Sequence, residues 1–135
     1  KKSGKEFYVF NLHYDHEGRV ARRNSSLLLL KRIQDIARDM PVFCTGDFNS
    51  IPEDEPIRII YDSGKLKDSY HVTRQSPYGT VGTFNSFNLH SPMKDRIDYI
   101  WVTKNIAVTK YGVLNEQQYA RFPSDHFPVM IKAVF

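Results

Sequence analysis

The chain has 135 residues, of which 41% are hydrophobic and 13% aromatic, so it has the size and composition of one packed domain, not of a disordered segment. Its formal net charge is +4 without a long basic run, and charge alone therefore predicts no nucleic-acid binding. The longest apolar stretch is too short to cross a bilayer, and the one cysteine, Cys44, excludes an internal disulfide framework and a cysteine-based metal cluster.

The first predicted elements are a strand, a helix and a second strand. Residues 7–10 are mostly apolar, which predicts a strand that is buried on both faces. Helical periodicity follows from residue 20 to residue 40, and Pro41 ends it. The predicted buried stripe of this helix comprises Leu29, Leu30, Ile33, Ile36, Ala37 and Met40. The apolar run 42–45 predicts a second buried strand, so two neighbouring parallel strands joined by a right-handed crossover are expected.

The remainder of the chain alternates short elements with long polar loops. Acidic residues and an early proline at residues 52–56 predict the start of a short helix. Its apolar face would comprise Ile57, Ile60 and Tyr61. Residues 71–95 are rich in Ser, Pro, Gly, Asn and His, and a loop of this length in a compact domain is usually functional. Three further strands are predicted at residues 97–102, 106–113 and 129–135, with a second polar loop at residues 119–126.

Chemically active side chains occur at or within four of these strands. They are His13, the pair Asp47 and Asn49, Asp98, and the pair Asp125 and His126. Ligand sites of open α/β sheets form outside the carboxyl ends of strands. Mg²⁺ prefers one or two carboxylates together with water and phosphate oxygens, so Asp47 and Asp125 are candidate ligands. The two histidines could act on a phosphate, one as a hydrogen-bond donor and one as an acid or base.

Each of these positions also has a purely structural interpretation. The residues Gly46 to Ser50 are typical of a turn, because Gly, Asp, Asn and Ser are the commonest turn formers. His13 alone is more often a surface or packed histidine than a catalytic one. Asp125 could belong to an ordinary turn in which Pro128 sets the start of the last strand.

Asp98 lies in a mostly apolar strand, where a lone carboxylate is unfavourable unless it is paired. A histidine would be a suitable partner and would itself be oriented by the carboxylate. Arg96, two positions along the strand and on the same face, is the alternative partner. The consecutive residues Ser124, Asp125 and His126 do not form a catalytic triad, because the members of a triad come from separate elements.

In their order along the chain, four motifs resemble the endonuclease/exonuclease/phosphatase superfamily, which has the deoxyribonuclease-I-like fold. The motifs are Asn11-Leu12-His13, Gly46-Asp47-Phe48-Asn49, Arg96-Ile97-Asp98-Tyr99-Ile100 and Ser124-Asp125-His126, and Arg23 and Thr83-Phe84 also fit the family pattern. Residues 1–135 resemble only the C-terminal half of such a domain. The resemblance therefore implies an α/β fold that is half of a four-layer α/β/β/α sandwich, one mixed sheet with helices on one face.

The resemblance implies a metal-dependent phosphohydrolase that uses Mg²⁺ or Mn²⁺ and cleaves a phosphate ester by in-line attack of water. Asp125 would serve the metal site, and Asp47 would share in it. The substrate would be a nucleic acid or a small phosphorylated molecule. The alternative is a catalytically silent domain that uses the same fold for binding or assembly.

Five residues would carry the reaction, and the resemblance implies the part that each plays. His13 would contact the scissile phosphate, and Asn49 would hydrogen-bond it as charge builds. Asp47 would position or deprotonate the attacking water. His126, oriented by Asp98, would stabilise the transition state or move a proton, and the division of labour between Asp47 and His126 stays open.

The resemblance also implies contributions from a first half of the domain, namely an Asn and a Glu that is a principal metal ligand. Neither occupies a matching position in this sequence. Half of a sandwich would leave one sheet face uncovered, with Val9, Phe43, Tyr99 and Trp101 on it. An apolar face of that size is normally an interaction surface. We therefore expect pairing with the N-terminal half or, as a homodimer, with a second copy, and the sequence predicts no cellular compartment.

Overall fold

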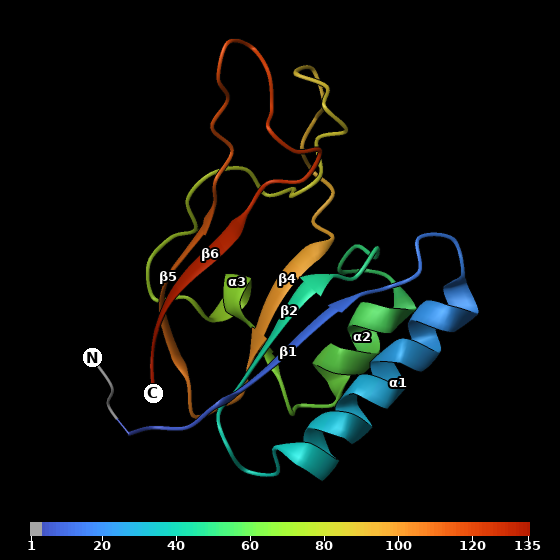
Figure 1. Ribbon diagram of the computed structural model, residues 1–135, viewed down its shortest axis with the longest axis vertical. Helices are drawn as coiled ribbons and strands as arrows, with labels where there is room; N and C mark the ends of the chain where they lie inside the picture. Colours follow the sequence, from blue (N-terminus) through green and yellow to red (C-terminus); the bar gives the residue numbers. More distant parts are fainter. Residues whose placement is uncertain (1–3) are drawn as a thin grey trace.

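The computed structural model describes residues 4–135 as a mixed four-stranded sheet with two helices on one face and a separate two-stranded sheet beside it (Figure 1). The α/β class predicted from the sequence is confirmed. In chain order the elements are β1 (Tyr8–His13), α1 (Arg19–Ile36), β2 (Val42–Asp47), α2 (Glu55–Asp62), β3 (Lys67–Asp68), α3 (Ser69–Val72), β4 (Asp98–Val102), β5 (Ala107–Val113) and β6 (Val129–Val134).

The unit β1–α1–β2 supplies one side of the sheet, and its two strands are parallel as predicted. The four-stranded sheet has the order β1-β2-β4-β3, with β4 antiparallel to β2. His13 pairs with Asp47 in the β1–β2 register, and Asp47 pairs with Asp98 in the β2–β4 register. The register therefore brings three of the predicted site residues side by side at one end of the sheet.

The main hydrophobic core lies between the four-stranded sheet and helices α1 and α2. Tyr99 and Trp101 of β4 are 1% and 0% exposed in it, with their rings stacked at 5.6 Å. The prediction that these two residues lie on an uncovered face is therefore wrong. Side chains alternate along a strand, so with Asp98 directed to the site face, Tyr99 must point to the helices.

The opposite face of the sheet is only partly covered. The sheet formed by β5 and β6 packs over its β4 side, through a cluster that includes Ile106, Val108 and the partly buried Phe43. Val9 on β1 stays 57% exposed. The prediction that the first strand is buried on both faces is wrong, because β1 is an edge strand and pairs with β2 alone within the described residues.

Both long helices bury a narrower stripe than the sequence predicted. In α1, Leu29 and Ile33 are buried, and so is Ala37 just after the helix, whereas Ile36 is 50% exposed. The helix ends at Ile36 and not at Met40, since Arg38 adopts a left-handed conformation with φ 51°. In α2, Tyr61 is likewise exposed, contrary to the prediction. Across residues 4–135, no helix combines the length and hydrophobicity needed to cross a membrane.

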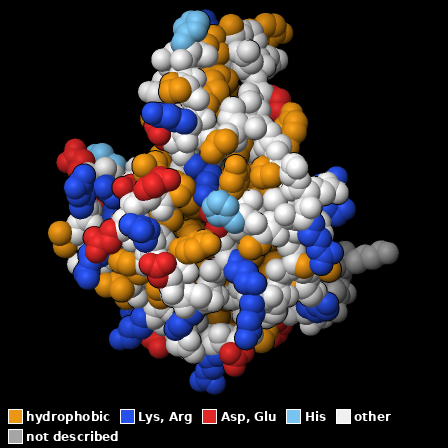
Figure 2. Space-filling model, turned by 180° about the vertical axis from the view of Figure 1, so that it is seen from behind, with side chains coloured by type: hydrophobic (Ala, Val, Ile, Leu, Met, Phe, Trp, Pro, Cys, Tyr) orange, Lys and Arg blue, Asp and Glu red, His pale blue; other side chains and the backbone are white. Residues whose placement is uncertain are grey.

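Two long loops project together beyond the end of the sheet at which β2 finishes (Figure 1). One precedes β4 and the other connects β5 to β6. Their tips carry exposed aromatic side chains, including Phe87 at 63% and Tyr119 at 89% exposure. Hydrophobic side chains gather on this projecting end (Figure 2). The predicted loop at residues 71–95 is confirmed, apart from the end of the short helix α3.

Candidate functional site

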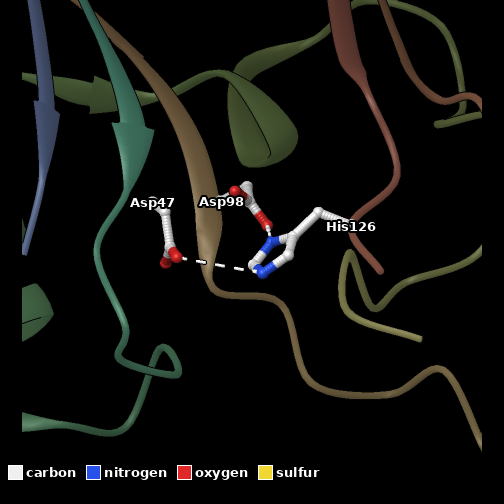
Figure 3. Close-up of side chains that lie close together, drawn as sticks. All are labelled: Asp47, Asp98 and His126. Atoms are coloured by element: carbon white, nitrogen blue, oxygen red, sulfur yellow. Dashed lines mark hydrogen bonds and ion pairs between the residues drawn. The ribbon is translucent and has the colours of Figure 1, made fainter. Parts of the chain in front are cut away.

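The candidate site lies where β2 ends, β4 begins and the β5–β6 loop returns to the sheet (Figure 3). The imidazole of His126 lies between two carboxylates. Its Nδ1 is 2.8 Å from Oδ2 of Asp98, and its Nε2 is 3.9 Å from Oδ2 of Asp47. An ionised carboxylate only accepts hydrogen bonds, so Nδ1 donates to Asp98 and Nε2 faces Asp47.

The backbone around Asp47 is shaped by the residues on either side of it. Gly46 has φ 144°, and a Cβ there would lie 1.9 Å from the carbonyl oxygen of Leu12, so only glycine permits this approach of β1 to β2. Asn49 adopts φ 46°, and its backbone N–H donates to Oδ1 of Asp47 at 2.7 Å. The turn predicted from composition is present, and it leaves Oδ2 of Asp47 free to face the site.

His13, at the end of β1, approaches the same carboxylate from the rim of the site. Its Nε2 is 3.4 Å from Oδ2 of Asp47, and its side chain is 73% exposed. Asn49 lies beside them, and its Nδ2 donates to the carbonyl of Tyr14 at 2.8 Å. A side-chain amide has two N–H donors, so one can still serve a ligand.

The partner of Asp98, left open by the sequence, is His126 and not Arg96. The guanidinium of Arg96 pairs instead with Asp68 at 2.7 Å, and both side chains are 3% exposed. The same guanidinium lies over the rings of Tyr70 and Tyr99. Arg96 therefore belongs to a buried structural pair, and the histidine partner expected for Asp98 is confirmed.

Asp125 stands apart from the three central side chains. Within residues 4–135, the group of potential metal ligands whose atoms all lie within 4.8 Å of one another consists of Asp47, Asp98 and His126. The carboxylate of Asp125 lies 3.5 Å from the hydroxyl of Ser124. Of the two predicted metal residues only Asp47 belongs to the group, and the metal role of Asp125 stays a prediction.

The donor set of Asp47, Asp98 and His126 is one that could hold a divalent cation. Mg²⁺ and Mn²⁺ favour oxygen ligands and are held by few protein groups together with water and phosphate oxygens. Oδ2 of Asp98 and Nδ1 of His126 are engaged with each other, whereas Oδ2 of Asp47 faces the imidazoles of His13 and His126. The site opens into a hollow of about 390 Å³, lined by residues that include Thr45, Ile100 and Val129.

The two members of the Asp98–His126 pair both have raised pKa values. Burial raises the pKa of Asp98, although hydrogen bonds with Thr83 and His126 act in the opposite direction. Burial alone would lower the pKa of His126, but the hydrogen bond to Asp98 and the charges of Asp98, Asp47 and Asp125 outweigh it. The raised pKa means that His126 holds a proton at a higher pH than an isolated imidazole.

Sequence reasoning missed one buried residue beside the site, Asn85. It is 0% exposed, and its amide donates to the carbonyl of Ser124 at 3.0 Å, directly before the Asp125-His126 pair. Asn in a Gly- and Ser-rich loop is ordinarily a turn residue. Only its position after Thr83-Phe84, which fits the family pattern, could have drawn attention to it.

Comparisons with known proteins give consistent matches. A sequence model described as the Endonuclease/Exonuclease/phosphatase family matches residues 2–126. The solved structure of a mannosyl-6-phosphatase from Bacteroides thetaiotaomicron VPI-5482 is 38% identical with a TM-score of 0.92, over 99% of this chain and 53% of that one. An endonuclease/exonuclease/phosphatase structure from Bacteroides vulgatus is 30% identical with a TM-score of 0.85, over 98% of this chain and 51% of that one.

The curated relatives are named for a different activity, that of an exoribonuclease. The CCR4-Not complex 3'-5'-exoribonuclease subunit Ccr4 of Emericella nidulans is 29% identical over 112 residues, which cover 66% of this chain and 16% of the relative. The same subunit from Candida albicans is 30% identical over 127 residues, covering 73% and 16%. The chain thus spans about half the length of the solved structures and a small part of the curated relatives.

Proposed function

The chain belongs to the endonuclease/exonuclease/phosphatase family, and from this premise we propose that it forms half of a metal-dependent phosphohydrolase that cleaves a phosphate ester by in-line attack of water. The observation that carries the proposal is the imidazole of His126, held by Asp98 at 2.8 Å and directed at Asp47. Phosphoryl transfer needs positioning and charge stabilisation more than a covalent nucleophile, and this arrangement supplies both.

Each residue of the central group has a role that follows from its contacts. Asp98 holds Nδ1 of His126, so that Nε2 can donate a hydrogen bond or a proton toward the phosphate. Oδ2 of Asp47, the oxygen that is not used in the turn, accepts a hydrogen bond from the attacking water and aligns that water for attack. A bound Mg²⁺ or Mn²⁺ would neutralise charge on the phosphate oxygens, and Asp47 would help to hold it.

Three further residues would complete the site. His13, at the exposed rim, would donate to the scissile phosphate, a role supported by the position of its Nε2 beside Asp47. The second N–H of the Asn49 side chain would bind a phosphate oxygen as charge develops. Asp125 would serve the metal together with ligands from the other half of the domain.

For the substrate class, we favour a phosphorylated sugar over a nucleic acid. The phosphatase of B. thetaiotaomicron, named for a mannosyl 6-phosphate group, matches nearly the whole chain at 38% identity, whereas the exoribonuclease relatives match less of it at 29–30%. The hollow of about 390 Å³ beside Asp47 is also within the usual size of small-molecule sites. Hydrolysis of RNA from a 3' end is the second candidate, supported by the names of those relatives.

The partner would be the other half of the same domain, packed on the open face of the four-stranded sheet. This face retains an exposed apolar side chain on β1, that of Val9 at 57% exposure. The matched structures are about twice as long as this chain, which favours a partner within the same protein over a second copy.

The test is hydrolysis by the full-length protein, assayed on an aryl phosphate, mannose 6-phosphate and a short oligoribonucleotide, with Mg²⁺ or with EDTA. His126→Ala and Asp47→Ala are each expected to lower kcat by about 10²- to 10⁴-fold, the range for loss of an acid–base group. Tyr61→Ala, at an exposed position on α2, is the matched control and should leave kcat unchanged.

Two results would contradict the mechanism. One is hydrolysis that persists in EDTA, and the other is activity that neither substitution affects. If none of the three substrates is cleaved while the folded protein still binds metal, the alternative of a silent binding or assembly domain is favoured. Preference for the oligoribonucleotide over the sugar phosphate would reverse the proposed substrate class but would leave the proposed mechanism unchanged.

A further inference from the structure

A three-residue segment, 83–85, lies between the start of β4 and the loop that carries His126. Thr83 and Asn85 are both 0% exposed. Between them, Phe84 forms an isolated β-bridge with His126, and their rings meet edge to face at 5.1 Å. The segment thus contacts both members of the Asp98–His126 pair, which are 28 positions apart in the sequence.

Thr83 fixes the β4 side of the pair. Its Oγ1 accepts hydrogen bonds from the backbone N–H groups of Ile97 and Asp98, each at 3.1 Å. A hydroxyl has two acceptor lone pairs and one hydrogen, so with both lone pairs used the hydrogen is free to donate. The carboxylate of Asp98 is the acceptor that this hydrogen can reach, and a hydrogen bond from Thr83 is among the causes that lower the pKa of Asp98. One buried hydroxyl therefore holds both the backbone and the side chain of Asp98.

Asn85 fixes the other side, the loop that ends in His126. Its backbone N–H donates to the carbonyl of Asp125 at 2.8 Å, and its side-chain Nδ2 donates to the carbonyl of Ser124 at 3.0 Å. Its Oδ1 accepts from the backbone of Phe87 at 2.7 Å, so the amide cannot rotate freely. The two residues immediately before His126 are therefore both anchored by Asn85.

We propose that Thr83 and Asn85 are positioning residues, which together set the hydrogen bond between Asp98 and His126. β4 and the β5–β6 loop share no strand pairing among the described residues, and segment 83–85 contacts both of them. The inference rests on the proposed function, since the pair matters only if His126 acts on a substrate. A purely structural link would change the free energy of unfolding but would leave the Nδ1 hydrogen bond of His126 and the kcat of the folded protein unchanged.

The test compares Thr83→Val with Thr83→Ser in the full-length protein with ¹⁵N-labelled histidine. Valine has nearly the shape of threonine but no hydroxyl, whereas serine keeps the hydroxyl. We expect the Nδ1 proton of His126 to give an NMR signal protected from exchange in the wild type and in Thr83→Ser, and to lose it in Thr83→Val. The kcat of Thr83→Val should fall by about tenfold or more with little change in KM, as expected for a lost hydrogen bond to a charged group.

A second pair of variants tests the other side and does not depend on Thr83→Val folding. Asn85→Ala should weaken the same NMR signal and lower kcat, while Asn88→Ala, an exposed asparagine of the same loop, should change neither. Retention of the signal and of kcat in both Thr83→Val and Asn85→Ala would overturn the inference. The NMR signal needs no substrate, so it can be measured even if the protein hydrolyses nothing. If Thr83→Val and Asn85→Ala lose the signal while the wild type shows no hydrolysis, the proposed function is refuted and the positioning role stands.

Discussion

At the scale of single residues, the carboxylate of Asp47 has a separate use for each oxygen. Oδ1 closes the turn by accepting from the backbone of Asn49, and Oδ2 faces His13 and His126. The structural and the functional interpretation of this residue are therefore compatible, because they concern different atoms. The turn fixes the rotamer of the side chain, and the fixed rotamer directs the second oxygen into the site.

The Cys44 thiol is fully buried in β2, and burial raises its pKa from 9.0 to about 12. Because the raised pKa belongs to the folded state, the stability that this group contributes is complete below pH 9 and declines as pH rises from 9 toward 12.

The buried Cys44 of the folded protein is expected to resist Ellman's reagent at pH 8 and to react once the protein is unfolded in guanidinium. As a control, Thr45→Cys, made with Cys44→Ser, should react while folded, and rapid labelling of native Cys44 would contradict the assignment.

The residue patterns identified which residues belong to the site, but they did not show which side chains pair with one another. His13, Asp47, Asp98 and His126 were all expected near one another, yet the sequence left Arg96 as an equal partner for Asp98. That alternative assumed that Arg96 lies two places along the same strand. In the structure β4 begins only at Asp98, so the alternation of a strand does not apply before it.

At the scale of elements, the helices and strands follow the hydrophobic periods closely, but their ends and exposed sides do not. Periodicity shows which residues can share a face, whereas the width of the buried stripe depends on what packs against it. Helix α1 packs against a narrow sheet, which covers Ile33 and leaves Ile36 in solvent. The sequence also did not predict that β5 pairs with β6 across the long loop 114–128, because tertiary contacts determine that pairing.

The two isoleucines of α1 provide a direct test of this packing. Ile33→Ala is expected to lower the free energy of unfolding by about 2–5 kcal/mol, because it removes a side chain that is 3% exposed from the core. Ile36→Ala, at 50% exposure in the same helix, should change it by less than about 0.5 kcal/mol. Urea denaturation monitored by circular dichroism measures both, and equal effects would show that α1 packs differently.

At the scale of the whole molecule, the sequence correctly indicated half of a larger domain but misplaced part of the open face. β5 and β6 cover the β4 side of that face, so the exposed apolar region is confined to the β1 edge. Composition and periodicity could not reveal this, because two sheets that pack face to face have the same alternating pattern as one.

The open face gives a prediction for residues 1–135 expressed alone. Without the other half, the chain is expected to self-associate at high concentration through the exposed apolar side chains of β1. Val9→Lys should suppress that association, whereas Val20→Lys, which is 71% exposed at the start of α1, should not. Sedimentation velocity measures the outcome, and a monodisperse monomer for the unmodified chain at high concentration would contradict it.

The candidate site is assembled from two bodies with separate hydrophobic clusters. Asp47 and Asp98 belong to strands of the main sheet, whereas His126 adjoins Phe127, which is buried with Tyr111 and Phe122 in a cluster of its own. Proteins open in cooperative sub-units, each with its own free energy. If the proposed activity is present, thermal inactivation should therefore precede melting of the helices. The half-life of that activity at elevated temperature would then report how firmly the small sheet packs on the main sheet, and not the stability of the whole fold.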